Sequence, residues 1–282
     1  MRILIAVIVL LFLCTANFAD GDAEKPITKE YGLAVFKLGE KFATDKKAGK
    51  SIDEFCGWLT DSIEAAEFKR RGVRNTPDEF KTLLEKDETA LAIVSPSFYL
   101  AHKGDLKLEA FAEATRGGFD GEVFSLVGKT KFDDYPEYAT IATSLSKDST
   151  YLNKVVLPKQ GDVKGIVWTH ASNTFDACYE IIDEEDGAPD YVLVDQLTLK
   201  QIQKDADLKT LTVAWTGKTL SQDLVVEVDG KLGDKRKEIA EALAKLCDTE
   251  AGKKIGKLIQ SPKFPAHNEK RLKEMETLWA KK

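Results

Sequence analysis

Three hydroxyl-rich segments stand where an apolar, strand-like stretch gives way to a helical pattern. Ser95-Pro96-Ser97 follows ALAIV, Ser146 to Thr150 follows the strand near Ile141, and Thr169 to Asn173 follows GIVW. The first turn of a helix offers free N–H groups and about half a positive charge, and hydroxyl side chains add further donors. Together the segments would suit an oxyanion, although Ser, Thr and Asn are also common helix caps.

Signatures of catalysis and of metal binding are missing from the sequence. It contains no G-x-G-x-x-G, Walker A, H-E-x-x-H, G-x-S-x-G or C-x-x-C pattern. His102, His170 and His267 are far apart and lack the companion spacing of a metal site. The densest acidic run, Asp183 to Asp186, ends a predicted helix and is typical of a solvated face. We therefore predict no catalytic residue, no metal site and no cofactor.

The composition is that of a globular protein with an acidic balance. The chain has 282 residues, of which 43% are hydrophobic and 31% are charged. At about 100 to 200 residues per domain, this length suggests two structural units. Lys and Arg number 41 against 47 Asp and Glu, which gives a net charge of -6 without a long basic block. Nucleic acid is therefore not an expected partner.

The first residues are typical of a secretory signal peptide. Arg2 precedes an unbroken apolar run from Ile3 to Leu13, which is too short to cross a bilayer of about 30 Å as a helix. We expect residues 1–19 to be removed after Ala19, with cleavage after Ala16 as the alternative. The remaining chain should be a soluble protein of the periplasm, because no other apolar stretch approaches membrane length.

The cysteines give a second indication about the exported chain. Cleavage before Cys14 with lipidation is disfavoured, because Leu13 is not the small residue that lipoprotein signals require. Cys56, Cys178 and Cys247 remain, an odd number, and each falls on the apolar stripe of a helical pattern. We predict buried free thiols rather than a disulfide or a nucleophile.

Hydrophobic periodicity and capping signals predict the order of helices and strands. Helices are expected to start at Ser51, with Glu54 completing a capping box, and at Thr76-Pro77. The predicted strands are Leu33–Gly39, Glu67–Val73, Thr89–Val94, Leu106–Ala114, Glu122–Gly128, Ala139–Thr143, Val163–Thr169, Tyr191–Val194, Leu211–Trp215 and Asp223–Val228. The later helices are predicted at Lys147–Val156, Ser172–Asp183, from Gln196, Asp234–Cys247, Thr249–Ile259 and Asn268–Ala280.

Two places in this order lack a helix between consecutive strands, which argues for two lobes. The chain would cross between the lobes twice, once between the strands of each pair, after Ala114 and after Trp215. An eight-fold barrel needs a helix after every strand and is therefore excluded. We expect residues 26–115 in lobe 1, residues 116–218 in lobe 2, and residues 219–282, with the final helices, back in lobe 1.

Several stretches together resemble one protein family. They are ALAIVSPSFYLAHKGDLKLEAFAEA, EVFSLVGK, KDSTYLNKVVLP, DYVLVDQLTLKQI and LAKLCDTEAGKKIGKL, in this order over roughly residues 30–262. The pattern resembles the phosphate/phosphonate-binding-protein-like family of periplasmic solute-binding proteins, which serve ABC importers. The resemblance implies an α/β chain with the two-lobed type 2 periplasmic-binding-protein (Venus flytrap) fold, two α/β lobes joined by two crossover strands.

The resemblance also implies ligand-binding residues. The family's ligand loop after the third strand matches Ser95, Ser97 and Tyr99, and its acidic residue after a later strand matches Asp195. The family's Ser-Thr-Ser-Gly helix start is matched only by Ser149 and Thr150, because Tyr151 and Leu152 replace the last two residues. Lys37, Thr169 and His170 are added because the predicted topology places them near the cleft, without a matching motif. The predicted ligand-binding residues are Lys37, Ser95, Ser97, Tyr99, Ser149, Thr150, Thr169, His170 and Asp195.

The function expected from these observations is binding, without catalysis. The leading hypothesis is a monomeric periplasmic protein that captures a small oxyanion of the phosphate, phosphite or phosphonate class and presents it to a membrane ABC permease. A ligand-sensing module whose closed form docks on a sensor kinase, or a binding protein for a non-phosphorus solute, is the alternative. A secreted hydrolase or transferase would need a nucleophile beside a base, and the sequence suggests no such pair.

Overall fold

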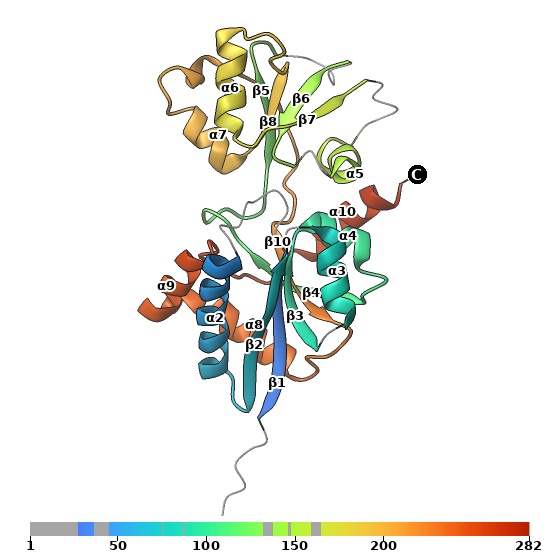
Figure 1. Ribbon diagram of the computed structural model, residues 1–282, viewed down its shortest axis with the longest axis vertical. Helices are drawn as coiled ribbons and strands as arrows, with labels where there is room; N and C mark the ends of the chain where they lie inside the picture. The colour runs from blue at the N-terminus through green and yellow to red at the C-terminus, as the bar shows by residue number, and fades with distance from the viewer. Residues whose placement is uncertain are drawn as a thin grey trace, which may run out of the picture.

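The computed structural model describes residues 28–36, 45–74, 76–86, 88–131, 138–145, 148–158 and 165–281. Among these residues, ten strands form two sheets of five strands each. The sheets lie in two lobes joined at a narrow waist (Figure 1). The predicted signal peptide, residues 1–19, and Lys37 lie outside the described residues.

Lobe 1 is built on a mixed sheet with the strand order β2-β1-β3-β10-β4. β1 pairs in parallel with β2 and β3, whereas β10 runs antiparallel to both of its neighbours. These strands are β1 (Lys29–Phe36), β2 (Ala66–Arg74), β3 (Thr89–Val94), β4 (Leu108–Ala114) and β10 (Asp223–Val228).

Both faces of the central strands of lobe 1 are covered by helices. On β1, Leu33 and Val35 pack into one core while Ala34 and Phe36 pack into another, since alternate side chains point to opposite faces. This double burial explains why the strands read as continuous apolar runs. The helices of the lobe are α2 (Asp45–Ser62), α3 (Pro77–Lys86), α4 (Pro96–His102), α8 (Lys235–Ala244), the 3-10 turn η3 (Leu246–Asp248) and α9 (Glu250–Leu258).

One helix of lobe 1 begins earlier than predicted, and another was predicted only by its start. α2 starts at Asp45, upstream of Ser51, because the turn before Ser51 also buries Ala48 against the core. The predicted capping box therefore lies inside the helix. The short helix α4 begins where the sequence predicted a helix start, at Ser95; Ser95 caps it by accepting a hydrogen bond of 3.3 Å from the backbone N–H of Phe98.

Lobe 2 has a second mixed sheet with the order β7-β6-β8-β5-β9. Its strands are β5 (Phe124–Gly128), β6 (Thr140–Thr143), β7 (Val167–His170), β8 (Tyr191–Asp195) and β9 (Thr212–Thr216). The helices are α5 (Ser149–Tyr151), which continues as the π-helical turn η1 (Leu152–Val156), α6 (Thr174–Asp183), α7 (Gln196–Ile202) and the 3-10 turn η2 (Leu208–Thr210). Apart from the split of α5 and η1 and the additional turn η2, the elements follow the predicted order.

The three cysteines of the described residues are free thiols. Cys56 and Cys178 are buried as predicted, whereas Cys247 is only partly buried. Burial raises the pKa of both Cys56 and Cys178 to about 12, so these thiols stay protonated at neutral pH. They pack as small hydrophobic residues, and the thiolate needed for reactivity is suppressed.

Two crossover segments, residues 115–123 and 217–222, carry the chain between the sheets. Glu122 and Leu220 pair across them, exchanging backbone hydrogen bonds of 2.8 and 2.7 Å. Gly121 has a φ of +87°, and a Cβ added there would stand 2.5 Å from Nη1 of Arg271 and 2.7 Å from the carbonyl of Leu220. Only glycine fits this turn, because both the conformation and the space exclude a side chain.

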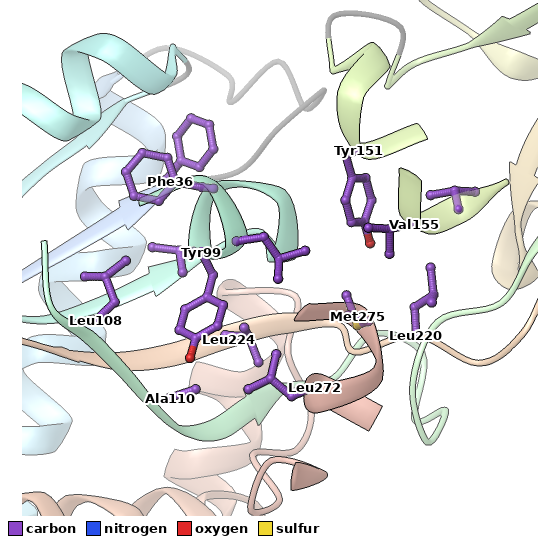
Figure 2. Packing of buried hydrophobic residues seen from close by; sticks show 14 of the residues in the cluster. Phe36, Tyr99, Leu108, Ala110, Tyr151, Val155, Leu220, Leu224, Leu272 and Met275 are labelled. Atoms are coloured by element: carbon purple, nitrogen blue, oxygen red, sulfur yellow. The ribbon is translucent and has the colours of Figure 1, made fainter. Parts of the chain in front are cut away.

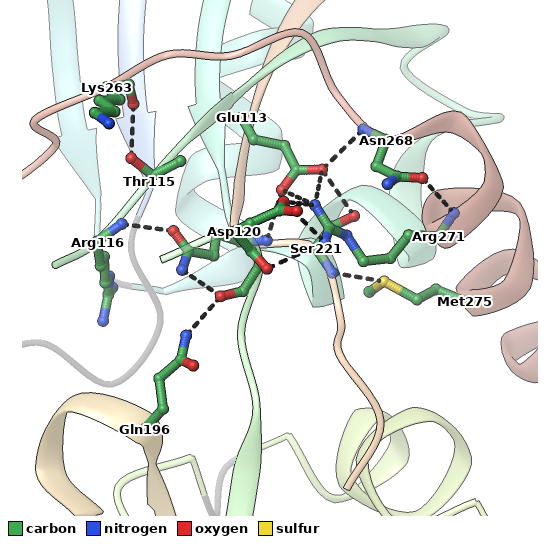
Figure 3. Close-up of polar contacts among 12 residues, drawn as sticks. Glu113, Thr115, Arg116, Asp120, Gln196, Ser221, Lys263, Asn268, Arg271 and Met275 are labelled. Atoms are coloured by element: carbon green, nitrogen blue, oxygen red, sulfur yellow. Dashed lines mark hydrogen bonds and ion pairs between the residues drawn. The ribbon is translucent and has the colours of Figure 1, made fainter. Parts of the chain in front are cut away.

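A buried ion pair ties the crossovers to the C-terminal helix α10 (Glu269–Ala280) (Figure 3). Glu113, 1% exposed, accepts hydrogen bonds of 3.2 and 3.1 Å from Nη2 of Arg271. Its carboxylate also accepts from the Ser221 hydroxyl and from the backbone N–H of Gln222 and Asn268. Arg271 in turn reaches Asp120 in the first crossover at 3.2 Å. We call this set of contacts the hinge network.

Helix α10 contacts both lobes at the waist. Near lobe 1, the Tyr99 hydroxyl donates to Glu276 at 3.4 Å. On the lobe 2 side, Lys154 of η1 donates to the carbonyl of Trp279 at 3.0 Å. Met275 and Tyr151 belong to one apolar cluster that runs through both lobes (Figure 2). The apolar packing therefore continues across the waist.

The hinge network makes a direct prediction about stability. Replacement of Arg271 by methionine leaves the Glu113 carboxylate buried without its cation, which should lower the free energy of unfolding by about 3 to 5 kcal/mol. Urea unfolding followed by circular dichroism measures this change. Lys270→Met, an exposed neighbour on the same helix, is the control and should stay within about 0.5 kcal/mol of the wild type. Equal effects of the two substitutions would contradict the assigned role.

Candidate ligand-binding site between the lobes

A cavity of about 150 Å³ lies between the two lobes at the crossovers. Its lining comes from both sheets and from both crossover segments. The lining residues are Ser95, Pro96, Ser97, Arg116, Glu122, Phe124, Thr143, Ser144, Leu145, Tyr151, Thr174, Leu193, Val194, Asp195, Thr198, Ser221, Gln222 and Asp223. A larger hollow of about 450 Å³, at Lys129, Tyr138 and Tyr191, belongs to lobe 2 alone. We take the interlobe cavity as the candidate site because buried polar groups converge there.

Lobe 1 contributes two buried hydroxyl groups to the cavity. Ser95 and Ser97 are 6% and 3% exposed, and their Oγ atoms are 3.0 Å apart. Ser95 is positioned by its capping role at the end of β3, and Ser97 follows in the first turn of α4. One hydroxyl donates to the other, so the pair keeps one proton available for a ligand acceptor.

Lobe 2 contributes hydroxyl groups and a carboxylate from two strand ends and a short helix. Thr143 is the last residue of β6, and Tyr151 ends the short helix α5. Asp195 caps α7 by accepting a hydrogen bond of 2.6 Å from the backbone N–H of Thr198. Burial, together with the nearby charges of Glu122 and other carboxylates, raises the pKa of Tyr151, so its hydroxyl stays a donor.

The crossovers contribute the charged groups. Arg116 follows β4, Glu122 precedes β5, and Asp223 begins β10. Asp223 is 7% exposed, and its Oδ2 lies 3.5 Å from Nη2 of Arg116. Arg116 is held in place by its backbone N–H, which donates to the Gln222 side chain at 2.5 Å.

Glu122 is the most strongly perturbed carboxyl group of the cavity. Burial raises its pKa from 4.5 to about 7, and the charges of Asp195 and Asp223 act in the same direction. Arg116 and the backbone N–H of Gln196 lower the pKa without restoring its ordinary value. Glu122 is therefore about half protonated near pH 7, unlike a carboxyl group at the surface.

The cavity includes three of the sequence-predicted ligand residues, Ser95, Ser97 and Asp195. Tyr99 is buried but directs its hydroxyl to Glu276 of α10, away from the lining. Ser149 and Thr150 are exposed in the first turn of α5.

The two remaining described candidates, Thr169 and His170, end β7. This strand is the edge of the lobe 2 sheet, and neither residue lines the cavity. Lys37 lies outside the described residues.

The sequence interpretation missed the residues that the crossovers bring together. Arg116 lies in a turn-like RGGFDG segment, and Glu122 and Asp223 were assigned only as strand ends. Tyr151 was treated as a departure from a motif, yet its side chain lines the cavity. A signal was available, because both predicted crossovers have an acidic residue where they enter the next strand.

The described ranges show neither a metal site nor a membrane-spanning helix. No group of three or more His, Cys, Asp and Glu residues there is arranged to hold a metal ion. No helix in the same part of the chain has the length and apolar character needed to span a membrane.

Comparisons with known proteins identify the fold. No family model and no curated protein matches the sequence. XAC2383 from Xanthomonas citri, solved bound to ATP, is 7% identical over 89% of this chain and 96% of its own, with a TM-score of 0.64. PhnD1 from Prochlorococcus marinus, solved with methylphosphonate, is 11% identical over 89% and 97%, with a TM-score of 0.57. A binding protein component of an ABC phosphonate transporter from Pseudomonas aeruginosa is 13% identical over 89% and 85%, with a TM-score of 0.57.

The chain has the two-lobed α/β Venus flytrap fold of periplasmic binding proteins. The mixed sheets, the antiparallel β10 and the paired crossovers define this class together with the structural similarity. The fold prediction from the sequence is confirmed. At identities of 7 to 13%, the similarity extends to the fold and not to the ligand.

The raised pKa of Glu122 predicts a pH-dependent stability. Ionisation of Glu122 costs more in the folded chain than in the unfolded chain, so its contribution to stability falls as pH rises from 4.5 to about 7. The stability advantage of Glu122→Gln over the wild type should therefore grow between pH 5 and pH 8, to at most about 3 kcal/mol. Urea midpoints at the two pH values measure the gain, with exposed Glu185→Gln as the control. A gain that is equal at both pH values would contradict the assignment.

Proposed function

We propose that this protein is a periplasmic solute-binding protein that captures a small solute between its lobes and presents the closed form to a membrane ABC permease. The observation that carries the proposal is the interlobe cavity, which both lobes and both crossovers line with polar groups. A solute in this position contacts both lobes only when they are closed, so its binding favours the closed form.

The size of the cavity limits the solute. Each molecule of liquid water occupies about 30 Å³, so 150 Å³ corresponds to about five waters or a solute of about five to eight non-hydrogen atoms. Methylphosphonate, the ligand in the Prochlorococcus structure, is of this size, whereas the ATP in the Xanthomonas structure is far larger. We infer a compact solute.

We propose that an oxyanion group of the solute binds on the side of the cavity that is lined by hydroxyl groups. Ser95, Ser97 and Thr143 offer hydroxyl donors, and Arg116 is the one basic residue among the described lining residues. Phosphate, phosphonate, sulfate and carboxylate groups all accept such donors. The export signal that the sequence predicts and the fold both support a periplasmic site of action and an importer as the partner.

Substitution of hydroxyl groups inside and outside the cavity tests the site. We expect Ser97→Ala combined with Thr143→Ala to weaken binding about thirtyfold, since each lost hydrogen bond contributes about 1 kcal/mol. The measurement is a thermal-shift panel of phosphate, methylphosphonate, sulfate, small carboxylates and amino acids, followed by calorimetric titration with the solute that gives the largest shift.

The matched control uses the hydroxyl groups that the sequence predicted but the cavity excludes. Ser149→Ala combined with Thr150→Ala should leave the affinity unchanged, because both residues are exposed at the start of α5. The reverse pattern, with loss of binding in this control and not in the cavity variant, would show that the site lies elsewhere. A panel without any stabilising solute would count against the binding function.

A further inference from the structure

The described lining of the interlobe cavity carries more negative than positive charge. Glu122, Asp195 and Asp223 face one guanidinium, that of Arg116, and the described lining includes neither lysine nor histidine. These carboxylates come from three different parts of the chain, since Glu122 precedes β5, Asp195 ends β8 and caps α7, and Asp223 begins β10. A solute that is only an anion would enter this site against like charge.

Two of these carboxylates have an oxygen without a hydrogen-bond donor. Oδ2 of Asp223 and Oε1 of Glu122 are both buried and both lack a donor among the described residues. Asp223 is 7% exposed, and the Arg116 guanidinium approaches its Oδ2 only to 3.5 Å. A buried acceptor without a donor is costly, so both oxygens are suited to a donor that a ligand supplies.

The chemistry of that donor follows from the acceptors. An ammonium group supplies three N–H donors and a positive charge, whereas a fully ionised oxyanion supplies only acceptors, and a protonated one adds an O–H donor without a positive charge. We propose that the cavity binds a solute with a protonated amine, and that its ammonium group is held by the carboxylates of Glu122 and Asp223. This inference rests on the proposed function, because it specifies the solute that the same cavity captures.

Proton release on binding is a consequence of this arrangement. Glu122 is half protonated near pH 7 because burial, Asp195 and Asp223 outweigh Arg116 and the Gln196 backbone N–H. A cation beside Glu122 favours its ionised form, so an amine should displace up to about half a proton at pH 7. An anion in the same place would have the opposite effect and cause proton uptake.

Matched probe pairs isolate the contribution of the ammonium group. Aminomethylphosphonate and methylphosphonate share one oxyanion, glycine and acetate share another, and ethylamine presents the ammonium without an oxyanion. Calorimetric titration of the purified protein at pH 7 gives the affinities. Two buffers that differ in ionisation enthalpy, neither of them a primary amine, give the number of protons exchanged. Calcium chloride is added to the panel as an inorganic cation.

Substitution of the two carboxylates locates the effect. Glu122→Gln and Asp223→Asn keep the shape of the side chains and remove the charge, and each should reduce amine affinity at least tenfold. Glu122→Gln should also abolish the proton release. Asp186→Asn, an exposed carboxylate on lobe 2, is the matched control and should change neither quantity. Thermal unfolding of each unliganded variant shows that it is folded.

The outcomes separate the inference from the proposed function. At least tenfold tighter binding of the amine member of either pair, with proton release, supports an ammonium site. Tight binding of methylphosphonate or acetate without preference for the amine, or with proton uptake, overturns the inference and leaves solute binding intact. A response to calcium in place of amines also overturns it. If no amine in the panel binds, the inference is wrong whatever the anions do.

Discussion

The buried pair of Glu113 and Arg271 is the contact on which the arrangement of the two lobes depends. Glu113 lies at the waist and accepts hydrogen bonds from the second crossover and from the start of α10, while Arg271 of α10 reaches the first crossover. A buried carboxylate needs this full set of donors, so the three segments must meet in one geometry. The geometry also places Glu122 and Asp223, and therefore the acidic part of the cavity, directly beside the hinge.

Much of the fold could be predicted from the sequence because burial leaves a strong periodic signal. β3 has the bounds that the apolar run Thr89–Val94 predicts, and the two helix-free strand pairs gave the two crossovers. Local signals failed where tertiary contacts decide. α10 contacts both lobes because its apolar residues meet η1, which only the assembled waist brings close.

The site was less predictable than the fold. Ser95, Ser97 and Asp195 were found because they follow strands, and strand ends in open α/β sheets converge on a cleft. The same rule also selected Thr169 and His170, which end an edge strand outside the cavity. Glu122 and Asp223 could not be recognised, since their proximity is created by the pairing of segments about one hundred residues apart in the chain. Charged residues that meet only at the hinge form no recognisable pattern in the sequence.

The central claim is that a solute is enclosed between the lobes beside the hinge carboxylates. The most direct measurement is a crystal structure of the protein with the solute that stabilises it most. The account predicts electron density for that solute between the lobes, in contact with Ser97 of lobe 1, Asp195 of lobe 2 and Asp223, which begins β10 directly after the second crossover. Density in the hollow at Lys129 and Tyr191, or against one lobe alone, would contradict the account.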